Sequence, residues 1–187
     1  VDRALVIQAQ AGDRVAFSRL ADEEWERLRR IAFGILRRAD LADDATQSAL
    51  LNVWRDLPRL RDPARYEAWV HRLLVRRCFA EAKRARRTLE RTLPLVDDDR
   101  PAEGGFDVID DRDQLERCFK RLSLEQRTVL VLHYYQGLPL NEIAEALDVP
   151  AGTIYSRLHR ALREMRGLLE ADARSASEPD AHREVVR

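Results

Sequence analysis

The sequence has little of the residues that mark several common classes of protein. Only two cysteines occur in 187 residues, Cys78 and Cys118, and they fall in separate amphipathic segments. A disulfide framework is therefore not expected, and both are predicted to be buried thiols. No apolar run approaches the roughly 20 residues of a membrane span, and the first residues lack the hydrophobic core of a signal peptide. We expect a cytoplasmic protein with no membrane contact of its own.

Glycine and proline are also scarce, at seven each, whereas 45% of the residues are hydrophobic and 35% are charged. This composition favours a helix-rich globular protein. The formal net charge is zero, so bulk charge gives no argument for nucleic acid. The charge is nevertheless segregated along the chain. Residues 55–92 hold twelve Lys or Arg against five Asp or Glu, while residues 93–116 hold two against nine.

Residues 140–169 have the pattern of two helices joined by a short turn. Ile143, Ala144 and Leu147 give the first helix one apolar face, and the turn spans Asp148–Gly152. The second helix has an apolar stripe and an opposite face rich in arginine, which is typical of a recognition helix in the major groove. A merely solvated face is the alternative. The candidate DNA contacts are Thr153, Tyr155, Ser156, Arg157, His159, Arg160 and Arg163.

A further helix precedes this pair. Ser123 and Gln126 have the spacing of a capping box, and Gly137 stands where a glycine ends a helix, so the helix is expected to run through Gln136. Three helices would then pack as a small DNA-binding unit, which begins near Arg112.

The first half of the chain predicts four helices, over residues 3–11, 14–38, 42–57 and 64–91, with Asp13 capping the second. In the third helix the pattern puts Trp54 toward the core and an acid, an amide and a leucine on a more exposed face, which suggests a contact with another protein. A plain amphipathic helix remains the alternative. The exposed face holds Asp44, Gln47, Ser48 and Leu51.

The fourth helix combines a basic face with aromatic residues. Phe79 falls within the basic arc and Trp69 at its edge, an arrangement that suits a single strand of nucleic acid because cations follow phosphates and rings stack on bases. An ordinary core position for Trp69 is the alternative. The basic arc holds Arg65, Arg72, Arg76, Lys83 and Arg87.

These patterns predict an all-α protein of two small helical domains. Residues 93–111 contain two prolines, a Gly-Gly pair and many acids, and are expected to form a flexible acidic linker. It would join an N-terminal domain, residues 1–92, to a helix-turn-helix domain, residues 112–170. Residues 171–187 lack periodicity and are expected to be a disordered tail.

Two separated stretches resemble the bacterial RNA polymerase sigma factors of the extracytoplasmic-function (ECF) class, a group of the sigma-70 family. The stretch DDATQSALLNVW with PRLRDPARYEAWVHRLLVRRCFAEAKRARR is similar to sigma region 2. The stretch LERCFKRLSLEQRTVLVLHYYQGLPLNEIAEALDVPAGTIYSRLHRALREMR is similar to sigma region 4. The resemblance implies a factor without catalysis of its own, which binds core RNA polymerase and promoter DNA.

The resemblance also implies roles for particular residues. Region 2 would dock on the β and β′ subunits of core polymerase through Asp44, Gln47, Ser48, Leu51 and Trp54. It would recognise and help to melt the minus-ten element through Arg61, Arg65, Trp69, Arg72, Arg76, Arg77 and Lys83. The region 4 residues given above would read the minus-thirty-five element. Several reading positions differ from the family's usual residues, so no promoter sequence is predicted.

The resemblance further implies control by an anti-sigma factor, and no cofactor, metal or small-molecule substrate. Two other functions are kept as alternatives. A stand-alone helix-turn-helix regulator would bind duplex DNA without polymerase, but no dimer seam or effector domain is evident. An enzyme is disfavoured because no Cys or His pair has metal-ligand spacing and the four histidines are dispersed. These are His71, His133, His159 and His182.

Overall fold

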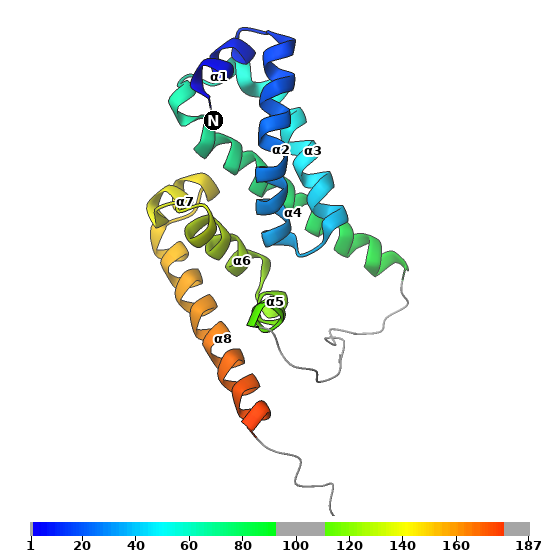
Figure 1. The fold of residues 1–187 in the computed structure, drawn as a ribbon, viewed down its shortest axis with the longest axis vertical. Helices are drawn as coiled ribbons and strands as arrows, with labels where there is room; N and C mark the ends of the chain where they lie inside the picture. Colours follow the sequence, from blue (N-terminus) through cyan, green and yellow to red (C-terminus); the bar gives the residue numbers. More distant parts are fainter. Residues whose placement is uncertain (1, 93–110, 178–187) are drawn as a thin grey trace, which may run out of the picture.

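The computed structural model describes residues 2–92 and 111–177, and within these ranges every regular element is a helix (Figure 1). The prediction of an all-α fold is confirmed. The predicted linker, apart from Asp111, and the end of the predicted tail lie outside the described residues.

The first half forms four helices and two short 3-10 turns. Asp13 caps α2 as predicted, since its carboxylate accepts hydrogen bonds from the backbone N–H groups of Val15 and Ala16. Arg37 ends α2 in the left-handed conformation, with a φ of 57°. The elements are α1 (Arg3–Gln10), α2 (Arg14–Leu36), α3 (Ala39–Asp56), η1 (Leu57–Arg59), η2 (Pro63–Arg65) and α4 (Tyr66–Thr92).

The second half forms α5 (Asp111–Arg121), α6 (Leu124–Leu130), η3 (Val131–Tyr135), α7 (Leu140–Leu147) and α8 (Ala151–Ser177). The predicted capping box is confirmed, because Ser123 and Gln126 each bind the other's backbone N–H. Gly137 has a φ of +69° and ends the helical run, also as predicted. The run itself is not uniform, since η3 is a π-helix, with one more residue per hydrogen-bonded turn than an α-helix.

The turn of the helix-turn-helix is shorter than predicted. Asp148 ends α7 with a left-handed φ of 55°, and α8 begins directly after Pro150. Gly152 therefore lies in the first turn of α8, and a side chain added there would meet nothing within 4 Å. The prediction that the turn extends to Gly152 is wrong, because the bend is made at Asp148.

The last helix continues past the predicted domain end at residue 170. Its extension contains residues that favour helices, and Asp172 accepts a hydrogen bond of 3.2 Å from Arg117 of α5. A second link holds α8 to α6, from Gln126 Nε2 to Glu164 Oε2 at 2.8 Å. Residues 171–177, which the sequence assigned to a disordered tail, are thus helical in the structure, and the Arg117–Asp172 pair links this extension to α5.

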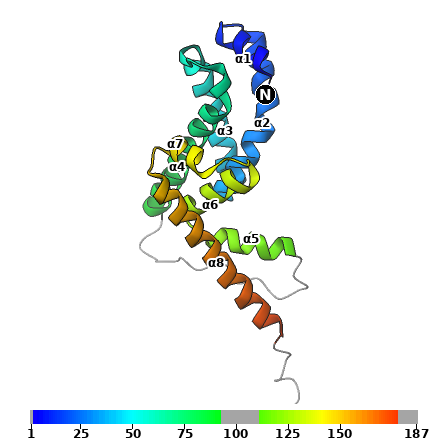
Figure 2. The same cartoon turned by 90° about the vertical axis from the view of Figure 1, so that its left-hand side faces the viewer.

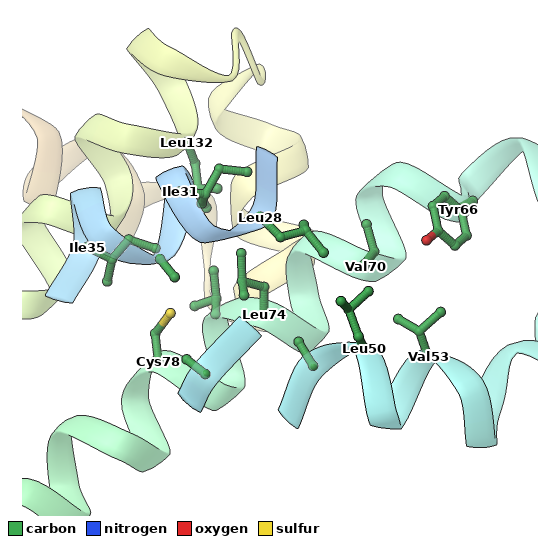
Figure 3. Packing of buried hydrophobic residues seen from close by; sticks show 14 of the residues in the cluster. Leu28, Ile31, Ile35, Leu50, Val53, Tyr66, Val70, Leu74, Cys78 and Leu132 are labelled. Carbon is green, nitrogen blue, oxygen red and sulfur yellow. The ribbon is translucent and has the colours of Figure 1, made fainter. Parts of the chain in front are cut away.

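The two halves share one hydrophobic core. Helix α6, η3 and α7 pack against α2 and α4, so that Leu132 lies beside Ile31 of α2 (Figure 3). A second, smaller cluster around Leu122, Leu130 and Ala161 lies within the second half. Helix α8 runs away from the first four helices (Figure 2). The sequence pattern does not predict this contact between the halves.

Candidate functional site

A groove between α2 and α3 gathers apolar side chains at the surface. It has a volume of about 600 Å³, and Leu51 and Trp54 remain 63% and 40% exposed. The Trp54 ring lies 4.7 Å from the ring of Phe17, measured between centroids. Large apolar side chains left in contact with water at a shared groove are typical of a protein docking site. The lining residues include Phe17, Trp25, Gln47, Leu50, Leu51 and Trp54.

The predicted polymerase contacts of α3 largely share one face. Gln47, Leu51 and Trp54 line the groove, and Asp44 is exposed one turn before Gln47 on the same side of the helix. Ser48 is half-buried and does not line the groove. The pattern was wrong in placing Trp54 toward the core.

Sequence reasoning missed the α2 wall of this groove. Phe17 and Trp25 have core spacing in their helix, yet both line the groove and only pack partly against the core. Their aromatic character was the available signal, because large rings at the edge of an apolar stripe often remain partly in water.

The basic face of α4 is exposed at some positions and covered at others. Arg76 and Lys83 of α4 are exposed, whereas Arg72 and Arg77 are half-buried. Arg61 and Arg65, which precede α4, are exposed as well. Arg72 donates a hydrogen bond from Nη2 to the carbonyl oxygen of Glu145 at 2.8 Å. Glu145 lies in the last turn of α7, so a predicted DNA contact of one half holds the end of a helix in the other.

The two aromatic side chains of the α4 face differ from the expected stacking platform. Phe79 packs partly against the core, so it does not offer a free ring to a base. Trp69 also packs partly against the core, with its ring 6.1 Å from that of Tyr66, but it lines a cleft at the same time. Trp69 therefore occupies a partly buried core position, as the alternative predicted, and also lines a surface cleft.

A buried polar cluster lies beneath this face. Arg27 pairs with the buried carboxylate of Glu24, and its Nη1 also donates to His71 Nε2 at 2.8 Å and to Gln136 Oε1 at 3.3 Å. Burial, helped by the charge of Arg27, lowers the pKa of His71 to about 4. His71 is therefore neutral at pH 7 and accepts from Arg27. The cluster joins α2, α4 and the end of η3.

Helix α8 presents its polar face to solvent. Tyr155 is 54% exposed, and Ser156, His159, Arg160 and Arg163 are exposed, while Thr153 and Arg157 are half-buried. Among the described residues, Arg157, Arg160 and Arg163 have no salt-bridge partner. Their guanidinium groups are thus available to phosphates and guanine edges.

The remaining features of the described chain give no second kind of site. Both cysteines are buried as predicted, and burial raises the pKa of the Cys78 thiol to about 12. Residues 2–92 and 111–177 hold no group of His, Cys, Asp or Glu side chains that could bind a metal ion. No helix in the same ranges is both long and apolar enough to cross a membrane.

Two family models match the chain. The model described as Sigma-70 region 2 matches residues 20–88, and the model described as Sigma-70, region 4 matches residues 112–165. The first match contains the α2/α3 groove and most of α4, and the second contains the helix-turn-helix. Both halves of the chain are thus sigma-70 domains.

Similar proteins narrow the class. An ECF RNA polymerase sigma factor, SigM of Mycobacterium tuberculosis (strain ATCC 25618 / H37Rv), is 33% identical over 172 residues, covering 90% of this chain and 84% of the relative. SigK of Mycobacterium ulcerans (strain Agy99), another ECF sigma factor, is 31% identical over 175 residues, which cover 90% of this chain and 93% of the relative. The chain belongs to the ECF RNA polymerase sigma factors, and the predicted resemblance is confirmed.

Solved structures agree on the fold. CnrH, solved in complex with the cytosolic domain of CnrY, has a TM-score of 0.65 at 24% identity, covering 91% of this chain and 98% of CnrH. The sigma factor RpoE of Bartonella quintana, solved with the anti-sigma factor NepR, has a TM-score of 0.64 at 22% identity. The match covers 83% of this chain and 98% of RpoE.

Proposed function

We propose that this chain binds core RNA polymerase through the groove between α2 and α3 and directs the enzyme to promoters. The observation that carries the proposal is the groove itself, where Leu51 and Trp54 are exposed beside Gln47. Covering such side chains with a partner gains roughly 25 cal/mol per Å² of apolar surface removed from water. Asp44 and Ser48 would add polar contacts at its edge. The partner would be the clamp region of the β and β′ subunits.

The promoter would be read by two separate surfaces. Helix α8 enters the major groove of the minus-thirty-five element, where the free guanidinium groups of Arg157, Arg160 and Arg163 suit an intact duplex. The basic face of α4, together with Arg61 and Arg65, captures the minus-ten element as it melts. We assign polymerase binding and minus-ten recognition to a unit of residues 1–92, and minus-thirty-five recognition to a unit of residues 112–170, with residues 93–111 joining the two.

The proposed action requires no catalysis by the chain itself. Binding energy alone places polymerase on the promoter, and the chemistry is that of the polymerase. Because polymerase and its promoters lie in the cytoplasm, the chain would act there.

An anti-sigma factor would control the chain by covering the same groove. The solved relatives of this fold include sigma factors bound to CnrY and to NepR. A groove that must stay apolar to bind polymerase is equally open to an apolar segment of another protein.

Reconstituted transcription tests the proposal. Core polymerase is supplied with this protein on genomic DNA fragments, and the parent is compared with Asp44→Arg, with Leu51→Asp and with Ile7→Asp as the matched control. Ile7 is also an exposed aliphatic residue, at 48%, but lies on α1 outside the groove. We expect discrete transcripts from a shared two-block motif with the parent and the control, and none with the two groove variants.

The opposite result would favour the stand-alone regulator. If the protein binds duplex DNA at specific sites but supports no transcript with core polymerase, the polymerase contact is wrong while the helix-turn-helix assignment stands. Equal transcription by the parent and the groove variants would move the polymerase contact to another surface.

A further inference from the structure

The segment between α3 and α4 carries two of the residues that we assign to the minus-ten element. Arg61 and Arg65 are both exposed there. The segment consists of η1, η2 and a short extended stretch between them, and it begins and ends in the core, because Leu57 and Tyr66 are buried. Packing therefore fixes its two ends, whereas its middle, around Arg61, lies at the surface.

Two prolines limit how far this segment can bend. Pro58 and Pro63 stand in the first turns of η1 and η2, and the ring of each proline fixes φ and removes a backbone N–H donor. Asp62 adds a local cap, since its carboxylate accepts a hydrogen bond of 2.9 Å from the backbone N–H of Ala64. These local features shape each short turn. A contact with a distant residue is needed to place the middle of the segment against the rest of the domain.

Helix α1 provides this contact. Gln10, the last residue of α1, donates a hydrogen bond of 2.5 Å from Nε2 to the backbone carbonyl oxygen of Leu60, across 50 residues of sequence. Helix α1 also packs against η1 and η2, and it lies beside the turn between α3 and α4 (Figure 1). Leu60 immediately precedes Arg61, so the amide of Gln10 holds the backbone from which the Arg61 side chain extends.

Helix α1 is itself well anchored. Leu5, Val6 and Ala9 are buried in the core, which fixes the face of α1 from which Gln10 reaches the segment. Gln10 is half-buried, whereas Gln8 on the same helix is exposed. The family model of region 2 begins at residue 20, so the match does not include α1. The support that α1 gives to the segment is therefore visible only in the structure.

We propose that Gln10 is a positioning residue for recognition of the minus-ten element. Through the carbonyl group of Leu60 it holds Arg61 in the orientation that reads bases of the melted strand. The proposal rests on the proposed function, since it concerns the same minus-ten surface. A segment that is ordered before binding loses less conformational entropy when it captures a strand. A fixed backbone also favours contacts to base edges, which carry sequence information, over contacts to phosphates, which do not.

Transcription from paired promoters tests this role. Full-length variants are combined with core polymerase on a promoter identified with the parent, and on the same promoter with its minus-ten bases exchanged. The measured quantity is the ratio of the two transcript yields. Both templates receive the same preparation, so the ratio does not depend on how much of a variant is folded or bound to polymerase. A merely structural role of Gln10 would leave this ratio unchanged.

The variants separate the hydrogen bond from the side chain's bulk. Gln10→Leu removes the donor and should lower the ratio by about threefold to tenfold, as expected for the loss of one hydrogen bond. Gln10→Lys restores a donor and should recover most of the ratio, whereas Gln10→Glu is close in size but cannot donate when ionised and should not. The matched control is Gln8→Leu, the same change at an exposed position of α1, which should retain the parent's ratio.

A nitroxide label attached at Arg61→Cys follows the segment directly and needs no promoter. The native cysteines are buried, so the reagent labels the introduced thiol. The electron paramagnetic resonance spectrum should show restricted motion of the label when residue 10 is Gln or Lys. Motion should be faster when residue 10 is Leu, because the backbone before the label has lost its contact with α1.

The outcomes separate this role from the proposed function. A ratio for Gln10→Leu equal to the parent's would overturn the positioning role, whatever the label shows. A Gln10→Lys variant that behaves like Gln10→Leu, or an equal loss in Gln8→Leu, would overturn it as well. In each of these cases the parent still transcribes, so the sigma function stands. A parent that yields no promoter-specific transcript would overturn both proposals.

Discussion

Helices α4 and α8 carry similar arginine-rich faces, but the face of α4 is partly covered by another helix and the face of α8 is not. On α8 the guanidinium groups of Arg157, Arg160 and Arg163 have no salt-bridge partner among the described residues, and the helix projects away from the first domain (Figure 1). On α4, Arg72 holds the end of α7 and Trp69 is half-buried in the cleft. The charge pattern of a helix thus indicates what its face can bind, whereas packing against a segment distant in the sequence determines whether that face is accessible.

The largest effect is expected from the core that both halves share. Leu132 is fully buried between them, so Leu132→Ala should lower the free energy of unfolding by about 2–5 kcal/mol. It should also loosen the contact between the halves, and thus raise the reactivity of a thiol placed by Glu142→Cys in the cleft between α4 and α7. Urea unfolding and the labelling rate measure the two effects.

Leu122→Ala is the control, because Leu122 is also buried but belongs to the cluster within the second half. It should cost stability without raising the labelling rate. Similar labelling rates in the two variants would mean that Leu132 does not hold the halves together.

The next effect is a dependence on pH through His71. Its pKa is lowered from 6.5 to about 4 in the folded chain by burial and by Arg27, although Glu67 opposes the shift. Between these values the unfolded chain binds a proton that the folded chain does not. The contribution of His71 to the free energy of unfolding is therefore fully present above pH 6.5. It should fall by up to about 3 kcal/mol as the pH drops to 4.

Urea unfolding as a function of pH measures this loss. In His71→Gln, an amide oxygen can still accept from Arg27 but cannot titrate, so the loss over this window should become smaller. An unchanged pH profile would assign the acid sensitivity to carboxylates elsewhere in the chain.

Substitutions on α8 should affect duplex binding directly. Arg157→Ala or Arg160→Ala is expected to weaken binding to a promoter duplex by roughly 1–3 kcal/mol if the residue contacts a base. Arg72→Ala on α4 should leave duplex binding unchanged, because that side chain is occupied by α7. Titration of labelled duplexes measures both. A loss that is equal for all DNA sequences would make the α8 residue a phosphate contact.

The smallest effect concerns the helix caps of the two halves. Ser123→Ala in the second half and Asp13→Ala in the first should each cost about 1 kcal/mol, because each removes a side-chain acceptor at a helix N-terminus. Since the halves share a core, both should shift one common unfolding transition. Two separate transitions, each sensitive to one substitution, would show that the halves unfold independently.

Much of the fold could be predicted from short sequence patterns at the ends of helices. The caps at Asp13 and Ser123 and the glycine at residue 137 lie where their patterns put them, because each depends on residues within a few positions. The polar face of α8 was predictable for the same reason. The residues on one face of a helix follow from the spacing of polar and apolar residues along that helix alone.

The features that the sequence did not predict depend on distant residues. Whether Trp54 or Trp69 packs inward depends on what α2 and α7 present to them, and both are large rings at the edge of an apolar stripe. The contact between the halves brings Gly34 of α2 close to Val131 of η3, and these two residues lie far apart in the sequence and share no pattern. The π-helical run η3 likewise leaves no mark in composition.

The run Val129, Val131 and Leu132 has a consequence for how the free protein behaves at high concentration. These side chains are buried in the core that the halves share. When the halves part without a partner, Val131 and Leu132 enter water together with their counterparts on α2, and exposed apolar patches of this kind promote self-association. The contact between the halves therefore keeps surplus chains dispersed whenever more of them are made than polymerase can take up.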